Sequence, residues 1–264
     1  MNLEHLLSLS IEAGVAAGKE ILEVYGTEFS VDIKEDSSPL TMADQKSHLK
    51  IMEYLRGTEY PILSEEGDLA DFSMHSNWHT FWLVDPLDGT KEFIKRNGEF
   101  TVNIALVQEG TPILGVIYLP VTDTLYAAAE GIGAYKAENG HKIHTIGALR
   151  AEGHSLPIPN DGPFTVVGSR SHMSAETEEF ISALEKEHGQ IEILSRGSSL
   201  KLCMVAEGSA QVYPRFAPTM EWDTGAGHGI ALQAGCEVVR HDSGEPLTYN
   251  KENLLNPWFI VRRK

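Results

Sequence analysis

Apolar positions in the first half of the chain predict two helices followed by a run of strands. Between Leu3 and Val24 apolar residues recur every three or four positions, which is typical of the buried face of an amphipathic helix ending at Gly26. A second helix is expected from Thr41, whose hydroxyl can cap free amides, to Gly57. Strands joined largely by short turns, as in an antiparallel meander, are expected over 60–64, 79–84, 101–108, 113–119 and 124–129.

The second half of the chain has a different pattern of expected elements. From Thr145 to Gly162 the chain is rich in Gly, Pro and polar residues, so we expect a connection there between an N-terminal part, 1–150, and a C-terminal part, 151–264. Strands and helices then alternate as in an α/β layer. The expected strands cover 164–168, 191–194, 210–216, 236–240 and 258–261, and the expected helices cover 175–187, 198–207 and 222–234. The fold class is therefore α+β followed by α/β.

Charge and composition exclude several classes of function. The chain has 264 residues, 42% of them hydrophobic, and a net charge of -17, which disfavours binding to a nucleic-acid polymer. The apolar run 113–119 is far too short to cross a bilayer, and residues 1–12 lack the basic and apolar stretches of a signal peptide. We therefore expect a cytoplasmic protein, monomeric or homodimeric, with Cys203 and Cys236 as reduced core residues.

A pair of acids gives the first chemical signal. Asp85 and Asp88 follow an apolar strand, and Pro86 between them favours a turn that would bring the two carboxylates within about 7 Å. Two anions so close need a cation, and Mg²⁺ prefers carboxylate and carbonyl oxygens, including the carbonyl of Leu87. A solvated Asp-Pro-x-Asp turn is the competing interpretation of this segment.

Two further acidic segments favour the metal interpretation. Glu65 and Glu66 follow an expected strand. Asp223 precedes a run of small residues at the start of an expected helix, Gly225, Ala226, Gly227 and Gly229, which permit close approach. The alternatives are a hydrated surface pair for Glu65 and Glu66 and a helix N-cap for Asp223. The glycines at 225, 227 and 229 do not have the spacing of a dinucleotide-binding fingerprint.

These segments together resemble a known family. Asp85-Pro86-Leu87-Asp88-Gly89-Thr90, with Glu65-Glu66 upstream and Trp222-Asp223-x-x-x-Gly227 downstream, resembles the two signatures of the inositol monophosphatase superfamily of Mg²⁺-dependent, lithium-sensitive phosphatases. Residues 89–103 and 212–216 resemble its bacterial bisphosphate nucleotidase branch. The resemblance covers nearly the whole chain and implies a layered αβαβα sandwich, with an antiparallel N-terminal sheet and an α/β C-terminal part.

The resemblance also implies a metal centre of two or three Mg²⁺ ions. One ion, shared by Glu65 and Asp85, would bind the attacking water, and a second would stabilise the leaving oxygen. The implied ligands are Glu65, Asp85, Asp88 and Asp223 with the carbonyl of Leu87.

The catalytic residues implied by the family are Asp44, Glu65 and Thr90. Thr90 would accept and relay a hydrogen bond from the metal-bound water, and Asp44 would orient Thr90. Taken by itself, the sequence gives Asp44 a structural interpretation, because Thr41 and Asp44 form a pair with capping-box spacing.

The implied substrate is adenosine 3',5'-bisphosphate, which would be hydrolysed to AMP and phosphate, with the sulfated form of this nucleotide as a second substrate. A bisphosphate needs a second anchor beside the metals, for which Arg170 and His172 are the weaker candidates. The implied substrate contacts are Asp88, Gly89, Thr90, Lys91, Ser198, Lys201, Arg215 and Asp223.

Two rival functions stay open at this point. The same fold could act on inositol monophosphate or fructose 1,6-bisphosphate, although Lys91-Glu92 after Thr90 favours the nucleotidase branch. Alternatively, the chain could be a noncatalytic regulator that binds nucleotide or metal. The superfamily also includes proteins at the inner face of the bacterial membrane, so a peripheral position there is an alternative to a purely cytoplasmic one.

Overall fold

Two helices form the first layer of the molecule. The computed structural model describes residues 1–28, 30–33, 39–67, 71–168 and 174–263. Helix α1 (Leu3–Tyr25) buries the apolar stripe expected from its sequence and ends at Gly26. Helix α2 (Met42–Leu55) begins at the expected cap, because the Thr41 hydroxyl accepts a hydrogen bond from the amide of Ala43.

The second layer is a seven-stranded sheet in the order β3-β4-β5-β6-β7-β8-β9. Consecutive strands from β4 onward pair antiparallel, as the short turns predict, whereas β3 pairs parallel with β4. The parallel pair differs from the expected meander because the longer segment between β3 and β4, which includes α3 (Phe72–His75), lets the chain return to the same edge. The strands are β3 (Ile62–Ser64), β4 (Thr80–Asp88), β5 (Thr101–Gln108), β6 (Thr111–Leu119), β7 (Thr124–Ala129), β8 (Gly133–Glu138) and β9 (His154–Ser155).

A third layer of helices covers the other face of this sheet. Helix α8 (Glu221–Gln233) packs closely on it because small residues meet at the contact. A Cβ atom at Gly115 of β6 would lie 2.2 Å from the carbonyl oxygen of Ala226, and one at Gly225 would lie 2.7 Å from Leu83. Helix α7 (Leu200–Glu207) packs beside α8. Small residues such as Gly225 and Gly229 therefore allow α8 to approach the sheet closely.

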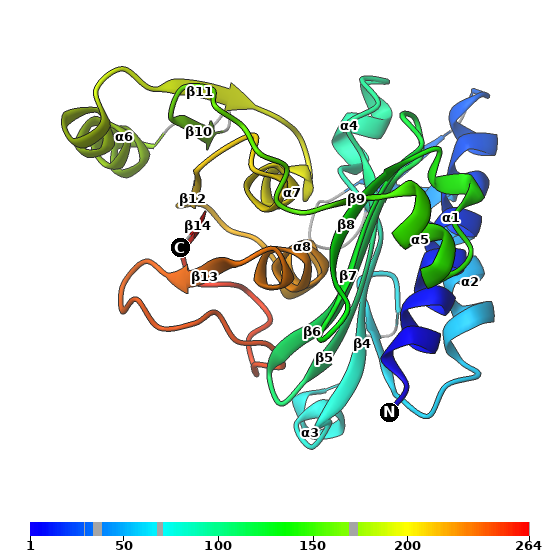
Figure 1. Cartoon of the computed structure of the whole chain (residues 1–264). Helices are drawn as coiled ribbons and strands as arrows, with labels where there is room; N and C mark the ends of the chain where they lie inside the picture. Colours follow the sequence, from blue (N-terminus) through cyan, green and yellow to red (C-terminus); the bar gives the residue numbers. More distant parts are fainter. Residues whose placement is uncertain (29, 34–38, 68–70, 169–173, 264) are drawn as a thin grey trace.

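A five-stranded sheet and one more helix complete the stack. The sheet has the order β11-β10-β12-β14-β13, and α6 (Ala175–His188) packs against it. Figure 1 shows the resulting α-β-α-β-α succession, which confirms the expected fold class. The strands are β10 (Thr165–Gly168), β11 (Glu192–Ser195), β12 (Val212–Arg215), β13 (Cys236–Arg240) and β14 (Phe259–Arg263), and a separate two-stranded sheet contains β1 (Val31–Ile33) and β2 (Pro39–Thr41).

The segment expected to be a plain connection contains regular structure. Thr145 caps the short helix α5 (Ile146–Glu152) by accepting a hydrogen bond from the amide of Ala148, and strand β9 then adds to the seven-stranded sheet. The sequence analysis did not predict helix α5 because only two of its residues are buried, too few to give a recognisable helical pattern of apolar positions. A single 3-10 turn, η1 (Gly140–Lys142), precedes it.

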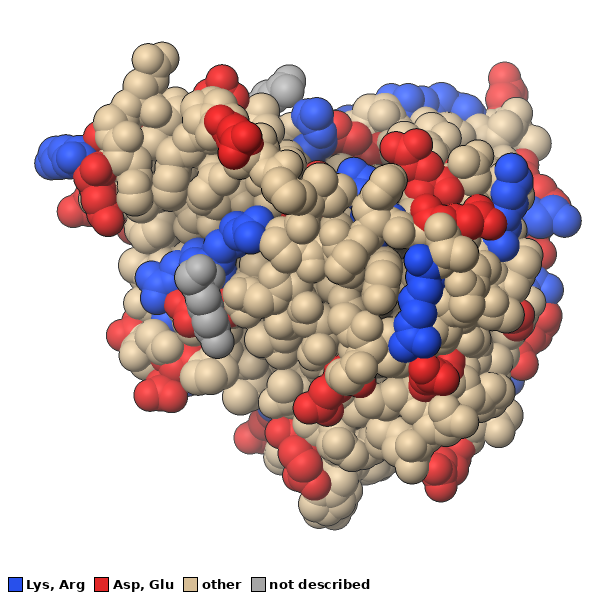
Figure 2. Space-filling model, in the orientation of Figure 1, with Lys and Arg blue, Asp and Glu red and all other residues tan. Residues whose placement is uncertain are grey.

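The surface and core agree with the composition. Lys and Arg side chains are interspersed with Asp and Glu on the face drawn in Figure 2. Cys203 and Cys236 are both buried and unbridged, as expected. Among the described residues, no helix combines the length and the apolarity that crossing a bilayer requires.

Candidate active site

A β-bulge in β4 places Asp85 and Asp88 on one face of the sheet. Asp85 pairs with Asn103 of β5 and Asp88 with Thr101, so three steps along β4 match two steps along β5. Asn103 and Thr101 are two residues apart and share a face, and the residues opposite them therefore share it too. Strand β4 thus continues through Asp88, where the sequence predicted that it would end before a turn at Asp85.

Two other segments bring acids to the same face. Glu65 follows β3 and is held beside β4 by the hydrogen bond from its amide to the carbonyl of Val84, at 3.1 Å. Asp223 comes from the first turn of α8. Carboxylate oxygens of Glu65, Asp85 and Asp223 all lie within 4.8 Å of one another. Three of the four predicted acids, from distant parts of the chain, therefore meet, whereas Asp88 is not in this group of three and lines the cavity beside it.

Asp223 also stabilises the start of its own helix, although it is not the N-cap residue. Met220 occupies that position, and the amide of Met220 donates to the Asp223 carboxylate at 2.8 Å. This bond fixes the carboxylate while it faces the other acids.

Burial and mutual repulsion make the acids hard to ionise in the absence of a cation. Burial raises the pKa of Asp85 well above its usual value, and the charges of its acidic neighbours, with Glu65 contributing most, raise it further. Burial, followed by repulsion from Asp88, raises the pKa of Asp223 to about 8. Burial also raises the pKa of Asp88, against the opposing effects of the Lys201 ammonium and the Ser199 amide. An all-oxygen anionic cluster of this kind fits a hard divalent cation.

The backbone between Asp85 and Asp88 is held from both sides. The amide of Leu87 donates to the Asp85 carboxylate at 3.0 Å, and the buried hydroxyl of Ser47 donates to the carbonyl of Pro86 at 2.6 Å. Leu87 itself lines a cavity with Glu65 and Asp223. The bulge is therefore fixed by hydrogen bonds in addition to the restricted φ angle of Pro86.

Thr90 and Asp44 lie next to this cluster. The Thr90 hydroxyl donates to Oδ1 of Asp44 at 3.2 Å. The other carboxylate oxygen of Asp44 accepts both the amide and the hydroxyl of Thr41, each at 2.7 Å. The capping contact and the Thr90 contact predicted from the sequence are thus both present in one buried carboxylate.

Asp88 has partners that the sequence analysis did not identify. Its Oδ2 atom accepts a hydrogen bond from the amide of Ser199 at 2.5 Å and one from the side chain of Asn103 at 3.4 Å. Ser199 belongs to a segment distant in sequence and had no visible signal, and Asn103 lies in an otherwise apolar strand run. A polar residue facing the acids from a buried strand was the only available clue.

Two adjoining cavities surround the cluster. The smaller one, about 260 Å³, is lined by Glu65, Asp85, Leu87, Asp88, Gly89, Thr90, Lys91, Glu92 and Asp223. The neighbouring cavity, about 410 Å³, shares Asp88, Lys91, Glu92 and Asp223 with it and includes the predicted contacts Ser198, Lys201 and Arg215. Both sets of predicted residues therefore lie in one continuous region, whereas the candidates Arg170 and His172 fall outside the described residues.

The two basic residues predicted from the sequence are placed differently. The buried ammonium of Lys201 donates to the carbonyls of Arg196 and Ser198, at 3.1 and 2.9 Å, so it anchors the loop that lines the larger cavity. One Arg215 nitrogen donates to the carbonyl of Pro218 at 2.9 Å. Its buried Nε atom has no hydrogen-bond partner, and among the described buried side chains it is the only such atom. Because Nε is shielded from solvent, the remainder of the Arg215 guanidinium is the part that can meet an anion in the larger cavity.

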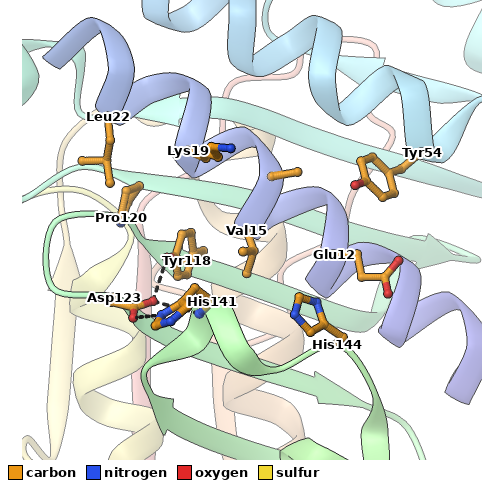
Figure 3. A pocket seen from close by; sticks show the side chains of 11 residues that line it. Glu12, Val15, Lys19, Leu22, Tyr54, Tyr118, Pro120, Asp123, His141 and His144 are labelled. Carbon is orange, nitrogen blue, oxygen red and sulfur yellow. Dashed lines mark hydrogen bonds and ion pairs between the residues drawn. The ribbon is translucent and has the colours of Figure 1, made fainter. Parts of the chain in front are cut away.

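A cavity larger than these two lies elsewhere. It measures about 680 Å³ and opens between α1 and the segment around η1, with Tyr118 and His141 in its lining (Figure 3). Its one aspartate, Asp123, is already paired with Tyr118 and His141. The cavity is therefore without the group of converging acids that marks the site at β4.

Comparison with the sequences of known proteins shows to which family the chain belongs. The model of the inositol monophosphatase family matches residues 2–258. The chain belongs to the inositol monophosphatase family. Within that family, the 3'(2'),5'-bisphosphate nucleotidase CysQ of Escherichia coli strain K12 is 48% identical over 251 residues, covering 93% of this chain and 94% of the relative.

Solved structures of the family show the same architecture. The crystal structure of CysQ from Bacteroides thetaiotaomicron matches with a TM-score of 0.91 and 51% identity, covering 100% of this chain and 99% of that one. The inositol monophosphatase of Anabaena (Nostoc) sp. PCC 7120 matches with a TM-score of 0.69 and 22% identity, covering 99% and 91%. The second likeness concerns the fold alone.

Proposed function

We propose that this protein is a Mg²⁺-dependent phosphatase that removes the 3'-phosphate of adenosine 3',5'-bisphosphate, giving AMP and phosphate. We extend the proposal to the 3'-phosphate of the sulfated form of the nucleotide. The observation that carries it is a carboxylate cluster adjoining a cavity rich in Lys and Arg, in a chain 48% identical to a bisphosphate nucleotidase.

The residues of the cluster fit Mg²⁺. Glu65, Asp85 and Asp223 offer only oxygen ligands. Burial, and after it repulsion between neighbouring acids, raises the pKa of Asp85 and of Asp223 in the absence of a cation. Asp88 and the carbonyl of Leu87 complete the proposed ligand set beside the same cavity. When bound, Mg²⁺ would supply positive charge that polarises the phosphoryl oxygens and acidifies the attacking water.

Thr90 and Asp44 are proposed to orient that water. The Thr90 hydroxyl uses its only proton toward Asp44 and Leu87, so its lone pairs can accept a hydrogen bond from a water in the cavity. Burial raises the pKa of Asp44, while hydrogen bonds from Thr41 and Thr90 oppose this effect and favour the carboxylate form. Asp44 can therefore keep the Thr90 hydroxyl directed as the water attacks.

The larger cavity is proposed to hold the rest of the nucleotide. Arg215 suits the phosphate that is not hydrolysed, because it lines this cavity and charge-assisted hydrogen bonds from guanidinium to phosphate are strong. In a chain with a net charge of -17, a local excess of cations marks this cavity as an anion site. Its Lys and Arg residues are Lys91, Lys95, Arg196, Lys201 and Arg215.

A substrate panel tests the proposal. Phosphate release would be measured with adenosine 3',5'-bisphosphate, its sulfated form, inositol 1-phosphate and fructose 1,6-bisphosphate during Mg²⁺ titration. We expect the first two to give the highest kcat/KM and no release in EDTA. A tenfold preference for inositol 1-phosphate, about 1.4 kcal/mol in the transition state, would overturn the substrate assignment. Nucleotide binding without any phosphate release in saturating Mg²⁺ would indicate a regulator instead.

A further inference from the structure

Asn103 lies between the two acids of the β4 bulge. It is 1% exposed and stands directly opposite Asp85 in the β4–β5 pairing. Its Nδ2 atom donates to Oδ2 of Asp88 at 3.4 Å. One buried amide therefore contacts the segment that carries both proposed ligands.

Neighbouring hydroxyls fix the orientation of this amide. Oδ1 of Asn103 accepts hydrogen bonds from the hydroxyls of Thr101 and Ser199, both at 2.9 Å. The opposite orientation would direct Oδ1 at the carboxylate of Asp88, where two acceptors repel each other. The amino group is consequently the part of Asn103 that faces Asp88.

The same oxygen of Asp88 accepts a second donor, the amide of Ser199, at 2.5 Å. The Ser198 side chain also bonds to this carboxylate. With Oδ2 held by the Asn103 and Ser199 donors, the direction of Oδ1 is fixed as well. Asp88 lines both cavities, so this fixed oxygen is the one available to a cation. Removing a partner that orients a ligating carboxylate in this way typically lowers metal affinity by about 10- to 100-fold.

We propose that Asn103 is a positioning residue of the metal site, acting through Asp88 and touching neither metal nor substrate itself. This inference rests on the proposed function. It adds that Asn103 determines which carboxylate oxygen of Asp88 faces the cation. Ser199 contributes through its backbone amide, so no side-chain substitution there would remove its contact with Asp88.

The test is a direct Mg²⁺ titration by calorimetry of the full chain and its Asn103→Leu variant, without substrate. Leucine has the same branching and number of heavy atoms as asparagine but no polar atom, and the Thr101 and Ser199 hydroxyls, 2.9 Å apart, can bond to each other in place of the amide. We expect the Mg²⁺ dissociation constant to rise about 10-fold or more. In saturating Mg²⁺, kcat should return to within about threefold of the wild type and the nucleotide KM should stay unchanged, because occupancy of the site is then restored.

Thr101→Val and Ser199→Ala serve as matched controls. Each removes one hydroxyl from Asn103 while both donors to Asp88 remain, so we expect a change in Mg²⁺ affinity of about threefold or less. A folded Asn103→Leu variant that binds Mg²⁺ as tightly as the wild type would overturn the positioning role, as would equal losses in all three variants. If Asn103→Leu does not fold, the Thr101→Val/Ser199→Ala double variant, which frees the amide to rotate, must lose affinity for the inference to stand.

The wild-type titration separates this inference from the proposed function. Wild-type protein that binds no Mg²⁺ would overturn both. Wild-type protein that binds Mg²⁺ and releases phosphate from the nucleotide, beside an unaltered Asn103→Leu variant, would overturn the role of Asn103 alone. Mg²⁺ binding that depends on Asn103, without phosphate release, would support the inference and reject the reaction.

Discussion

The hydroxyl of Thr90 donates to one oxygen of Asp44, while the other oxygen of the same carboxylate caps helix α2 through Thr41. The two contacts give Asp44 a structural and a proposed catalytic role at once. Since each oxygen has its own partner, the two roles can be separated by substitution.

Asp44→Asn should reduce kcat by about 100-fold or more, because the amide removes the charge that directs the Thr90 hydroxyl. Stability should fall by about 1 kcal/mol through the weakened cap. Thr41→Val is the control, since it removes the capping hydroxyl and leaves Thr90 bonded to Asp44. It should lose similar stability in urea unfolding while kcat stays within about twofold; equal kcat losses in the two variants would count against the catalytic role.

Much of this site could be predicted because its acids stand beside strong local signals. Glu65 and Asp85 follow apolar strand segments, and Asp223 precedes a run of small residues. The family resemblance then indicated that these segments form one site. The fold class followed from the change between the two halves of the chain, from consecutive strands to alternating strands and helices.

The remaining features depend on pairing between strands. That Asp85 and Asp88 share a face follows from one extra residue in β4 relative to β5, and no local pattern predicts where a bulge falls. Asn103 looks like an ordinary polar position in an apolar strand until its neighbours across the sheet are known. The loop contact from Ser199 to Asp88 spans 111 residues and is equally invisible in the sequence.

Asp88→Asn should leave the protein folded and abolish phosphate release at ordinary Mg²⁺ concentrations. The Asn carbonyl can still accept the Ser199 amide, whereas the charge needed to hold a divalent cation is lost. In EDTA its melting temperature should equal or exceed that of the wild type, because one repelling carboxylate has gone. Scanning calorimetry and a phosphate assay would check both; wild-type turnover by this variant would rule out the ligand assignment.

Arg215→Met should weaken binding of the second phosphate. Methionine retains much of the apolar stem but cannot supply the guanidinium donors or the positive charge that Arg215 brings to the cavity. We expect KM for adenosine 3',5'-bisphosphate to rise about 10-fold or more, since hydrogen bonds to charged groups contribute about 1.5–3 kcal/mol. KM for 3'-AMP, which has only the phosphate to be removed, should change by about twofold or less. Parallel increases for both nucleotides would contradict the assignment of Arg215 to the second phosphate.

Without metal, the protein should become less stable as the pH rises toward 9. The pKa of Asp223 is raised to about 8 in the folded chain from an ordinary value of 3.8, so between these values the folded state binds more protons than the unfolded state. The free energy of unfolding therefore decreases with increasing pH in that window. Melting temperatures in EDTA should be higher at pH 6 than at pH 9. The Asp223→Asn variant should reduce this difference, whereas Asp161→Asn, at an exposed position, should preserve it.

Because protons compete with the cation for the same oxygens, Mg²⁺ affinity measured by titration should show the opposite trend and increase from pH 6 to pH 9. A metal-free stability that increases over this range in the wild type, or an unchanged slope in Asp223→Asn, would contradict the raised pKa assigned to Asp223.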